Sequence, residues 1–495
     1  MREEDALRNI RNIAAWTAGI AALALVVGLI VVPPFVGMAD SGDFGRVLST
    51  SGLKVLHPAS SYEELYFNYA QRQFGYGGYA LGGYVSTHVA LVAIAGWIGR
   101  AIDGEIFDVR ILGALYTAMF AFAVALLVKH APSPNGRQPA LIATALLAAA
   151  LLFVFGDIGY VAYFHSFFGE PYALVAMLFA LAAALAIASA SRPSALMLAL
   201  FVAAAAAVAT SKIQNAPLGF AFALLAWRMA RLRDDRKWRR QAWTGAVVLL
   251  VVSSLMIVAA PNRLKHANLY QSVFYGVLKD SPDVSRDMKE LGIPAKYAVL
   301  AGTNYFQKNT AIPQNDPILR REVLDKLGHK DIALYYLRHP SRFAQKIERA
   351  AANAAYIRPA YLGNYEATAG KPPGALSHAF SAWSGFKAAH MPRNAGFYLA
   401  FFAAYGLGLA CLWLRAATRG RRLAAETLAV VALTGVFSFV IPLIGDGEAD
   451  LGKHLFMFNV CFDMMVISVF AGTVYGVVRL GERIGETANR KATWG

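Results

Sequence analysis

The sequence predicts an all-α, polytopic membrane protein, and three observations lead to this fold class. Of the 495 residues, 57% are hydrophobic and only 16% are charged, which is too little charge to cover the surface of a soluble protein of this length. The mean hydropathy is +0.44. Apolar runs of about 20 residues recur along the chain, which is the length that a helix needs to cross a hydrocarbon core roughly 30 Å thick. These runs must be helical, because lipid offers their backbone groups no hydrogen-bonding partner.

The net charge of +16 does not indicate a nucleic-acid partner. The basic residues concentrate in short loops between apolar runs, which is the pattern that places such loops in the cytoplasm. Cys411 and Cys461 both lie inside apolar runs, so the sequence predicts neither a disulfide framework nor a CxxC metal site. The first apolar run is too long for the core of a cleaved signal peptide, so we expect it to be a retained first span.

Eleven apolar runs are candidate spans, and counting them produces a conflict. The runs cover residues 13–36, 79–99, 109–129, 139–156, 171–190, 194–210, 214–231, 243–260, 394–415, 424–444 and 455–478. If all of them cross the membrane, two basic loops that carry the cytoplasmic pattern, 129–138 and 228–241, fall on the outer side.

Removing the run 79–99 from the spans repairs both misplacements. Its first half contains glycines, polar residues and His88, and an acidic stretch follows it at 102–108. We therefore expect a helix lying along the outer membrane interface. This leaves about ten spans, with both termini in the cytoplasm and two long outer segments at 37–108 and 261–393.

Three parts of the chain follow from this topology. Residues 1–260 form an N-terminal transmembrane module whose first outer loop is 37–108. Residues 261–393 are too long for a connecting loop and are expected to form a small, mostly helical extracytoplasmic insert. Residues 394–495 contain the C-terminal spans and a cytoplasmic tail.

Polar residues gather in four clusters at the predicted outer boundary: Asp40 to Arg46, Asp157 to Glu170, Thr210 to Asn215, and Asp446 to His454. Ionisable groups at membrane depth are costly, so their default interpretation is a functional site. Each cluster also has a structural explanation. Asp40, Asp157 and Glu170 could cap helices, Lys212 could extend to the interface, and 446–454 could be a solvated turn.

These residue types suit transfer from a lipid-linked phosphate donor to a hydroxyl acceptor. A carboxylate at the membrane surface can act as a general base, and nearby lysines and arginines can hold a departing phosphate. Tyrosines of the same face are candidates for stacking on sugar rings: Tyr62, Tyr66, Tyr76, Tyr79, Tyr160 and Tyr163.

Several of these motifs resemble the GT-C superfamily of membrane glycosyltransferases. Gly42-Asp43-Phe44 is similar to the catalytic acidic element that follows the first span in that superfamily. The stretch 79–113 resembles its surface helices, and Asp157 is similar to a second acidic position. The run 446–454, together with Asp43 and 169–171, looks most like bacterial glycan-biosynthesis hexose transferases of S-layer type.

The resemblance implies a GT-C-like fold and an inverting transfer in a bacterial inner (cytoplasmic) membrane, with the site facing the periplasm. The implied partners are a polyprenyl-phosphate-linked sugar donor, a glycan or lipid-linked acceptor and membrane lipids. Asp43 is favoured as the base, with Asp40 supporting it. Candidate donor-phosphate contacts are Lys212, Arg263, Lys265, Lys453 and His454. Candidate sugar or acceptor contacts are Asp157, Tyr163, His165, Glu170, Asp446, Glu448 and Asp450. No cofactor is required, although Asp157 and Glu170 leave a divalent metal such as Mg²⁺ or Mn²⁺ open.

Three other functions remain open. A transporter or lipid flippase would place charged groups near the membrane midplane within inverted repeats, and the sequence shows neither. A glycan ligase or polymerase would use arginines and histidines of the insert (Arg358, His378, His390 and Arg393). A non-enzymatic assembly subunit would not depend on Asp43. The sequence identifies neither the sugar, the acceptor nor the oligomeric state, and places possible acceptor contacts in the insert at Tyr270, Tyr275, Asn304, Tyr305, Tyr361 and Asn364.

Overall fold

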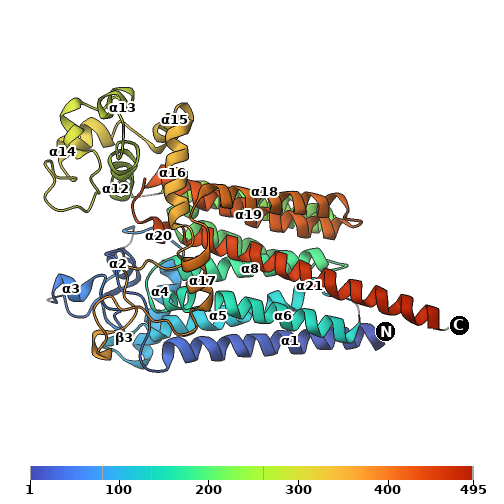
Figure 1. The fold of residues 1–495 in the computed structure, drawn as a ribbon. Coiled ribbons are helices and arrows are strands. Elements are labelled where there is room, and N and C mark those ends of the chain that lie inside the picture. The colour runs from blue at the N-terminus through green and yellow to red at the C-terminus, as the bar shows by residue number, and fades with distance from the viewer. Residues whose placement is uncertain (1, 59, 81, 135, 260, 493–495) are drawn as a thin grey trace.

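The computed structural model describes residues 2–58, 60–80, 82–134, 136–259 and 261–492. Long helices lie side by side in a bundle, and a smaller helical lobe stands at one end of it (Figure 1). Within the described residues, eight helices are long and apolar enough to cross a membrane. The predicted all-α polytopic fold class is therefore confirmed.

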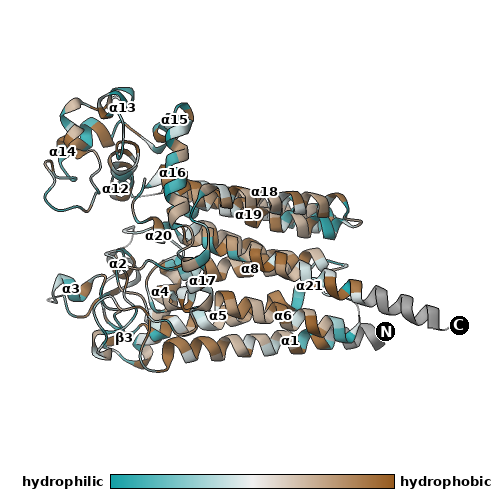
Figure 2. Ribbon diagram, viewed as in Figure 1, coloured by the Kyte–Doolittle hydropathy of each residue, from teal (hydrophilic) through white to brown (hydrophobic). Residues whose placement is uncertain are grey.

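The long helices correspond to eight of the ten predicted spans. They are α1 (Arg2–Val26, continued by the π-helix Val27–Val31), α5 (Arg110–His130), α6 (Arg137–Phe155), α8 (Glu170–Ser189), α11 (Arg236–Val258), α18 (Ala395–Leu414), α19 (Arg419–Gly445) and α21 (Phe456–Ala492). Figure 2 shows hydrophobic residues along these helices and hydrophilic residues gathered in the lobe and near the helix ends.

The two other predicted spans are shorter helices. α9 (Ala195–Ser211) has 17 residues and α10 (Leu218–Met229) has 12, followed by the 3-10 helix Ala230–Leu232. At a rise of 1.5 Å per residue these helices are about 25 and 18 Å long, less than the thickness of the hydrocarbon core.

The run 79–99 contains a helix that begins later than predicted. α4 (His88–Ile102) has 15 residues, and a non-helical stretch with positive φ at Gly82 precedes it. α4 packs against α5 and against α2 (Phe44–Ser51). At 15 residues α4 is longer than α10 and shorter than α9, so its length alone does not distinguish it from those two predicted spans.

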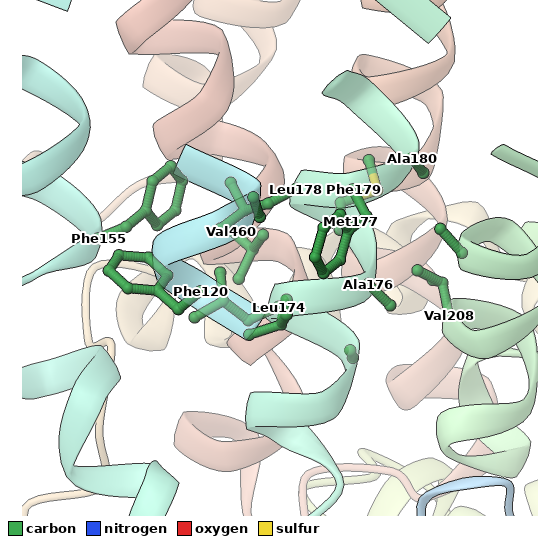
Figure 3. Packing of buried hydrophobic residues seen from close by; sticks show 14 of the residues in the cluster. Phe120, Phe155, Leu174, Ala176, Met177, Leu178, Phe179, Ala180, Val208 and Val460 are labelled. Carbon is green, nitrogen blue, oxygen red and sulfur yellow. The ribbon is translucent and has the colours of Figure 1, made fainter. Parts of the chain in front are cut away.

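The bundle is organised around α8, which packs against α5, α9, α19 and α21. α1 covers α5 and α6, and α10 lies between α11 and α19. Figure 3 shows Phe120, Phe155 and Val460 gathered near residues of α8 such as Leu174 and Met177. Small residues on α8, including Ala176 and Ala180, allow neighbouring backbones to approach closely, which drives helix association in lipid.

The loop 37–108 contains a small sheet that the sequence did not predict. Strands β1 (Leu53–Val55), β2 (Gln73–Tyr76) and β3 (Ile106–Asp108) pair antiparallel in the order β1-β2-β3. The short helix α3 (Tyr62–Leu65) lies between β1 and β2 in the chain, and α2 packs against β1 and α4.

The insert is mostly helical, as predicted. Its helices are α12 (Asn262–Ser272), α13 (Val284–Glu290), α14 (Pro317–Leu319), α15 (His329–Arg338), α16 (Pro340–Asn353) and α17 (Ala382–His390). The first part has a small core of its own, which includes Phe274, Tyr297 and Tyr335. A later stretch returns to the loop after α1, where Gly37 N donates to Asn364 O (2.9 Å) and Ala39 N donates to Gly363 O (2.9 Å). The insert thus contributes to the same end of the bundle as the loop 37–108.

Candidate functional site

A cavity of about 700 Å³ opens where α2, the α9–α10 connection, the insert and the turn before α21 meet. The first loop contributes Ser41, Gly42, Asp43, Arg46, Tyr62, Tyr66, Phe67 and Tyr84, and the α9–α10 connection contributes Lys212, Ile213 and Gln214. The insert contributes Leu264, Ala267, Asn268, Gln271, Asn304, Phe306, Lys308 and Tyr361, and the final turn contributes Asp446, Ala449, Asp450, Lys453 and His454. Three of the four polar clusters that the sequence singled out therefore reach one cavity.

Asp40 and Asp43 have different positions at the start of α2. The Oδ1 atom of Asp40 accepts hydrogen bonds from Gly42 N (2.7 Å) and Phe44 N (3.0 Å), so this buried carboxylate satisfies backbone donors at the helix start. Gly42 has a φ of +95°, which a side chain at this position would disfavour. Asp43 makes no such cap and lines the cavity. Asp43 is therefore the carboxylate that faces the cavity, whereas Asp40 holds the start of the helix.

Asp43 is held by two cations. Lys453 Nζ lies 2.5 Å from Asp43 Oδ2, and Arg46 Nη2 lies 3.0 Å from Asp43 Oδ1. Burial raises the pKa of the Asp43 carboxyl, but the charges of Lys453 and Arg46 outweigh burial and lower the pKa well below its usual range. Asp43 is consequently ionised, with 26% of its side chain still exposed toward the cavity.

Lys453 is the centre of this arrangement. Its ammonium also donates to Ser41 Oγ (3.1 Å), lies 3.2 Å from Asp450 Oδ2 and stands 4.8 Å from the centroid of the Phe168 ring. Burial lowers the pKa of Lys453, but the nearby carboxylates outweigh it and raise the pKa above its usual value. Asp450 adopts a left-handed backbone (φ 47°), which turns the chain so that α20 (Leu451–His454) presents Lys453 inward.

His454 and Asp446 join three segments that line the cavity. His454 Nε2 lies 2.8 Å from Asp446 Oδ2, and its Nδ1 lies 2.8 Å from Gln214 Oε1. Gln271 of α12 donates to Asp446 Oδ1 (2.8 Å). This network fixes the last turn against the α9–α10 connection and the insert.

Lys212 and Glu170 form a buried ion pair at the cavity wall. Lys212 lines the cavity, whereas Glu170 lies behind it at the first residue of α8 and is only 2% exposed. Glu170 therefore positions Lys212. Glu170 was expected to contact the sugar, but it is not among the described residues that line the cavity.

Four other expected sugar or acceptor contacts are not among the described residues that line the cavity: Asp157, Tyr163, His165 and Glu448. Asp157 caps α7 (Ile158–Val161) through Gly159 N (2.7 Å) and accepts from Ser384 N (2.9 Å). Glu448 pairs with Lys279 (2.8 Å) and Lys346 (2.6 Å) of the insert. Asp157 and Glu448 thus tie parts of the fold together, because their oxygens are already used by these partners.

Tyr163 and His165 are packing residues of the same buried region. Tyr163 is fully buried against Phe456, with ring centroids 4.9 Å apart. His165 Nδ1 lies 2.8 Å from Val36 O, its ring stacks on Phe35, and burial lowers its pKa to about 4. His165 is therefore neutral and holds the chain just after α1.

Lys265 and Arg263, at the start of the insert, were expected to contact the donor phosphate. Lys265 donates to Val258 O (3.2 Å) at the end of α11 and is not among the described residues that line the cavity. Arg263 lies in α12, and its side chain falls outside the described residues.

Sequence reasoning missed several lining residues. Arg46 stands three positions after Asp43 at the start of a helix, and this spacing alone indicates that the two side chains can meet. Tyr84, Lys308 and Gln271 carry no comparable local signal. Of the tyrosines proposed for sugar stacking, Tyr62 and Tyr66 line the cavity, as do Asn304 and Tyr361 of the insert.

Sequence reasoning also missed a buried ion pair beside α21. Lys387 of α17 donates to Asp463 Oδ1 (2.7 Å) and Asn459 Oδ1 (2.6 Å). Asp463 Oδ2 accepts from Tyr160 (2.6 Å) and Trp383 (2.8 Å). The pair links the insert helix α17 to the start of the α21 span, so Asp463 is an acidic residue within a span whereas Lys387 is not. An acidic residue within an apolar run was the available signal.

The cavity combines cations, carboxylates and aromatic rings. Its lining includes four basic side chains (Arg46, Lys212, Lys308, Lys453) and three carboxylates (Asp43, Asp446, Asp450), in addition to His454. Within the described part of the chain, no group of three or more His, Cys, Asp or Glu side chains is arranged to hold a metal ion. The arrangement can hold an anionic group beside an ionised carboxylate.

Comparison with known proteins identifies the family of this chain. No curated protein and no solved structure matches it significantly. The sequence model of one family, described as the YfdI N-terminal transmembrane domain, matches residues 2–485. With eight full-length apolar helices in the described residues, the chain is a multi-pass membrane protein, and it belongs to the YfdI N-terminal transmembrane domain family.

Proposed function

We propose that this protein is an integral-membrane glycosyltransferase that moves a sugar from a polyprenyl-phosphate donor to a hydroxyl group of a glycan or lipid-linked acceptor. The observation that carries the proposal is the position of Asp43, an ionised carboxylate that lines the cavity beside Arg46 and Lys453. A base next to phosphate-binding cations is what transfer from a sugar phosphate to a hydroxyl requires.

The reaction follows from this arrangement. The acceptor oxygen attacks the anomeric carbon while Asp43 takes the hydroxyl proton. The bond between the anomeric carbon and the donor phosphate oxygen breaks, and its electron pair leaves with the phosphate. Lys453, Arg46 and Lys212 stabilise the developing negative charge. Attack on the face opposite the leaving phosphate inverts the anomeric configuration.

Asp43 needs a change of environment to accept the proton, because its paired cations lower its pKa. A donor phosphate supplies this change. When the phosphate shares Lys453 and Arg46, each cation interacts less with Asp43, and the pKa of the carboxyl rises toward the range in which a base is effective. Donor binding and base activation are thereby coupled.

Aromatic and amide side chains give the same cavity a surface suited to sugars. Tyr62, Tyr66 and Tyr361 present rings to the cavity, and Gln214 and Asn304 present amides. Rings can cover the apolar faces of a sugar, whereas amides can both donate to and accept from its hydroxyls. By analogy with the GT-C superfamily, the site faces the periplasm of a bacterial inner membrane.

The rival ligase interpretation is not supported by the residues that suggested it. Arg358 is buried, where it donates to Asn364 and Ser377 (2.5 Å each), and Arg393 donates to Ala388 O (2.6 Å). Neither is among the described residues of the cavity lining.

The test is a transfer assay with the purified full-length chain in proteoliposomes that contain a radiolabelled polyprenyl-phosphate hexose and a membrane extract as acceptor source. We expect label to move from the donor lipid into a second product, with release of polyprenyl phosphate. Label that crosses the bilayer while still attached to the donor lipid would identify a flippase instead. Inactivation by a chelator with recovery on adding Mg²⁺ or Mn²⁺ would show that a metal participates.

A further inference from the structure

A second hollow lies at the opposite end of the bundle from the cavity. α19 connects the two, because Arg419, Arg422 and Glu426 near its start line this hollow, whereas Asp446 just after its end lines the cavity. With a rise of 1.5 Å per residue, the two sites are separated by on the order of 35 Å along the helix. The hollow has a volume of about 520 Å³.

Arginines dominate the lining of this hollow. Six of them converge from the end of α10 and its 3-10 turn, the start of α11 and the start of α19: Arg228, Arg231, Arg233, Arg239, Arg419 and Arg422. Of the described residues in the lining, only Asp234 and Glu426 carry carboxylates. A guanidinium matches a phosphate group with two parallel hydrogen bonds, so this charge imbalance favours a phosphate-bearing anion.

The two acidic side chains neutralise only part of the positive charge of these arginines. Glu426 is occupied by Arg228 (2.6 Å) and by Trp413 Nε1 (2.9 Å), and Asp234 lies 3.5 Å from Arg419. Arg231 and Arg422 are exposed and lie over tryptophan rings, 4.9 Å from the centroid of Trp227 and 5.3 Å from that of Trp413. Among the described residues, neither is within salt-bridge distance of a carboxylate, so both guanidinium groups are available to an anion.

The hollow continues directly into an apolar groove between α10 and α11. The groove has a volume of about 610 Å³ and shares Trp227 and Trp243 with the hollow. Its other lining residues are Phe220, Ala223, Leu224, Ala246, Val247 and Leu250. Leu224 and Val247 are 55% and 56% exposed, as expected of a face that meets lipid tails. Basic residues in a loop are expected wherever a loop lies on the cytoplasmic side of a membrane. That expectation does not account for an apolar groove joined to the basic hollow.

We propose that the hollow and the groove together bind an anionic diacyl phospholipid, with the phosphate among the arginines of the hollow and an acyl chain in the groove. Basic pockets between helices at the membrane surface are suited to anionic headgroups, and the groove distinguishes a lipid from a free anion. The tryptophans lie where a polar headgroup meets an apolar chain, which is the environment their rings prefer.

The test is native mass spectrometry of the detergent-purified full-length chain titrated with dioleoyl phosphatidylglycerol or dioleoyl phosphatidylcholine. We expect the wild type to bind the phosphatidylglycerol more tightly. R231Q/R422Q should weaken that binding about thirtyfold, since each basic group near an anionic surface contributes roughly one kcal/mol. R286Q/R321Q removes the same charge from exposed positions of the insert and should leave binding unchanged.

A groove variant tests the lipid separately from the charge. V247W fills the groove from an exposed position without touching the arginines, and we expect several-fold weaker phosphatidylglycerol binding at an unchanged unfolding temperature. Equal phosphatidylglycerol affinity in wild type and R231Q/R422Q would overturn the proposal. Displacement of the lipid by inorganic phosphate in millimolar excess, or unchanged binding by V247W, would also overturn it, because the hollow would then hold a free anion.

Discussion

Lys453 and Asp43 lie 410 positions apart in the chain, yet their side chains meet at 2.5 Å inside the cavity. The pair joins the start of α2 to the turn before α21 and keeps the carboxylate ionised. The same lysine therefore links two segments that are far apart in the sequence and is also a candidate phosphate ligand.

Replacing Lys453 should change the pH dependence of turnover. In the wild type the lysine lowers the pKa of Asp43, so the carboxylate stays ionised as the pH falls into the acidic range. K453M removes this charge, the pKa of Asp43 rises, and the acidic limb of the pH–rate profile should move to higher pH with a lower maximum. K453R keeps a charge and is the matched control. An identical acidic limb in wild type and K453M would contradict this assignment.

Variants of the Lys212–Glu170 ion pair can distinguish the contribution of Lys212 to stability from its contribution to phosphate binding. K212M leaves the buried Glu170 carboxylate unpaired and should destabilise the protein by about 3–5 kcal/mol. The double variant K212M/E170Q removes both charges and should regain most of the stability. It should still lose donor affinity, because the cavity lacks one of its cations. Thermal unfolding and KM for the donor are the two readouts, and a double variant with wild-type KM would show that Lys212 is purely structural.

The buried pair of Lys387 and Asp463 should contribute to stability and not to catalysis. D463N leaves Lys387 without its carboxylate in a fully buried site, and we expect a loss of about 3–5 kcal/mol in the free energy of unfolding. K387M/D463N should be markedly more stable than D463N, with turnover per folded molecule close to that of the wild type. A turnover loss in the stable double variant would instead indicate that the pair takes part in the reaction.

Asp40 should make stability depend on pH. Burial raises its pKa to about 6, so the folded protein binds the proton more tightly than the unfolded chain does. The folded state is accordingly favoured at low pH and loses stability as the pH rises from about 4 through 6, by about 2–3 kcal/mol. D40N keeps the acceptor for Gly42 and Phe44 but does not ionise, so the difference in unfolding temperature between variant and wild type should grow across this window. A constant difference would contradict the raised pKa.

The spans were predictable because length and composition alone determine which helices can cross a membrane. What the sequence did not reveal was where a run contains a break. The run 214–231 overlaps the 3-10 helix Ile213–Asn215 and contains Pro217, so its regular helix begins only at Leu218. The strands of the first loop were missed because three or four residues are too few for an alternating pattern to emerge.

The sequence predicted where the residues of the candidate site lie, but not which other side chains they contact. Asp43, Lys212, Lys453 and His454 were found because ionisable groups at a membrane boundary are costly and must be used. For Asp40 the sequence offered both a helix cap and support for Asp43, and the backbone donors of Gly42 and Phe44 show that it caps the start of α2. The role of Glu448 could not be assigned, because it depends on which insert lysines the fold brings to it. Sequence spacing carries no information about such long-range contacts.

The most direct test of the central claim compares D43N with the wild type in the transfer assay at saturating donor. Asparagine preserves the shape of the side chain but cannot accept the proton, so we expect kcat to fall by about 10²–10⁴-fold while KM for the donor changes little. E105Q, which alters an exposed carboxylate of the same loop, should retain wild-type turnover. A D43N variant that transfers sugar at the wild-type rate would contradict the account, because Asp43 would then not be the base.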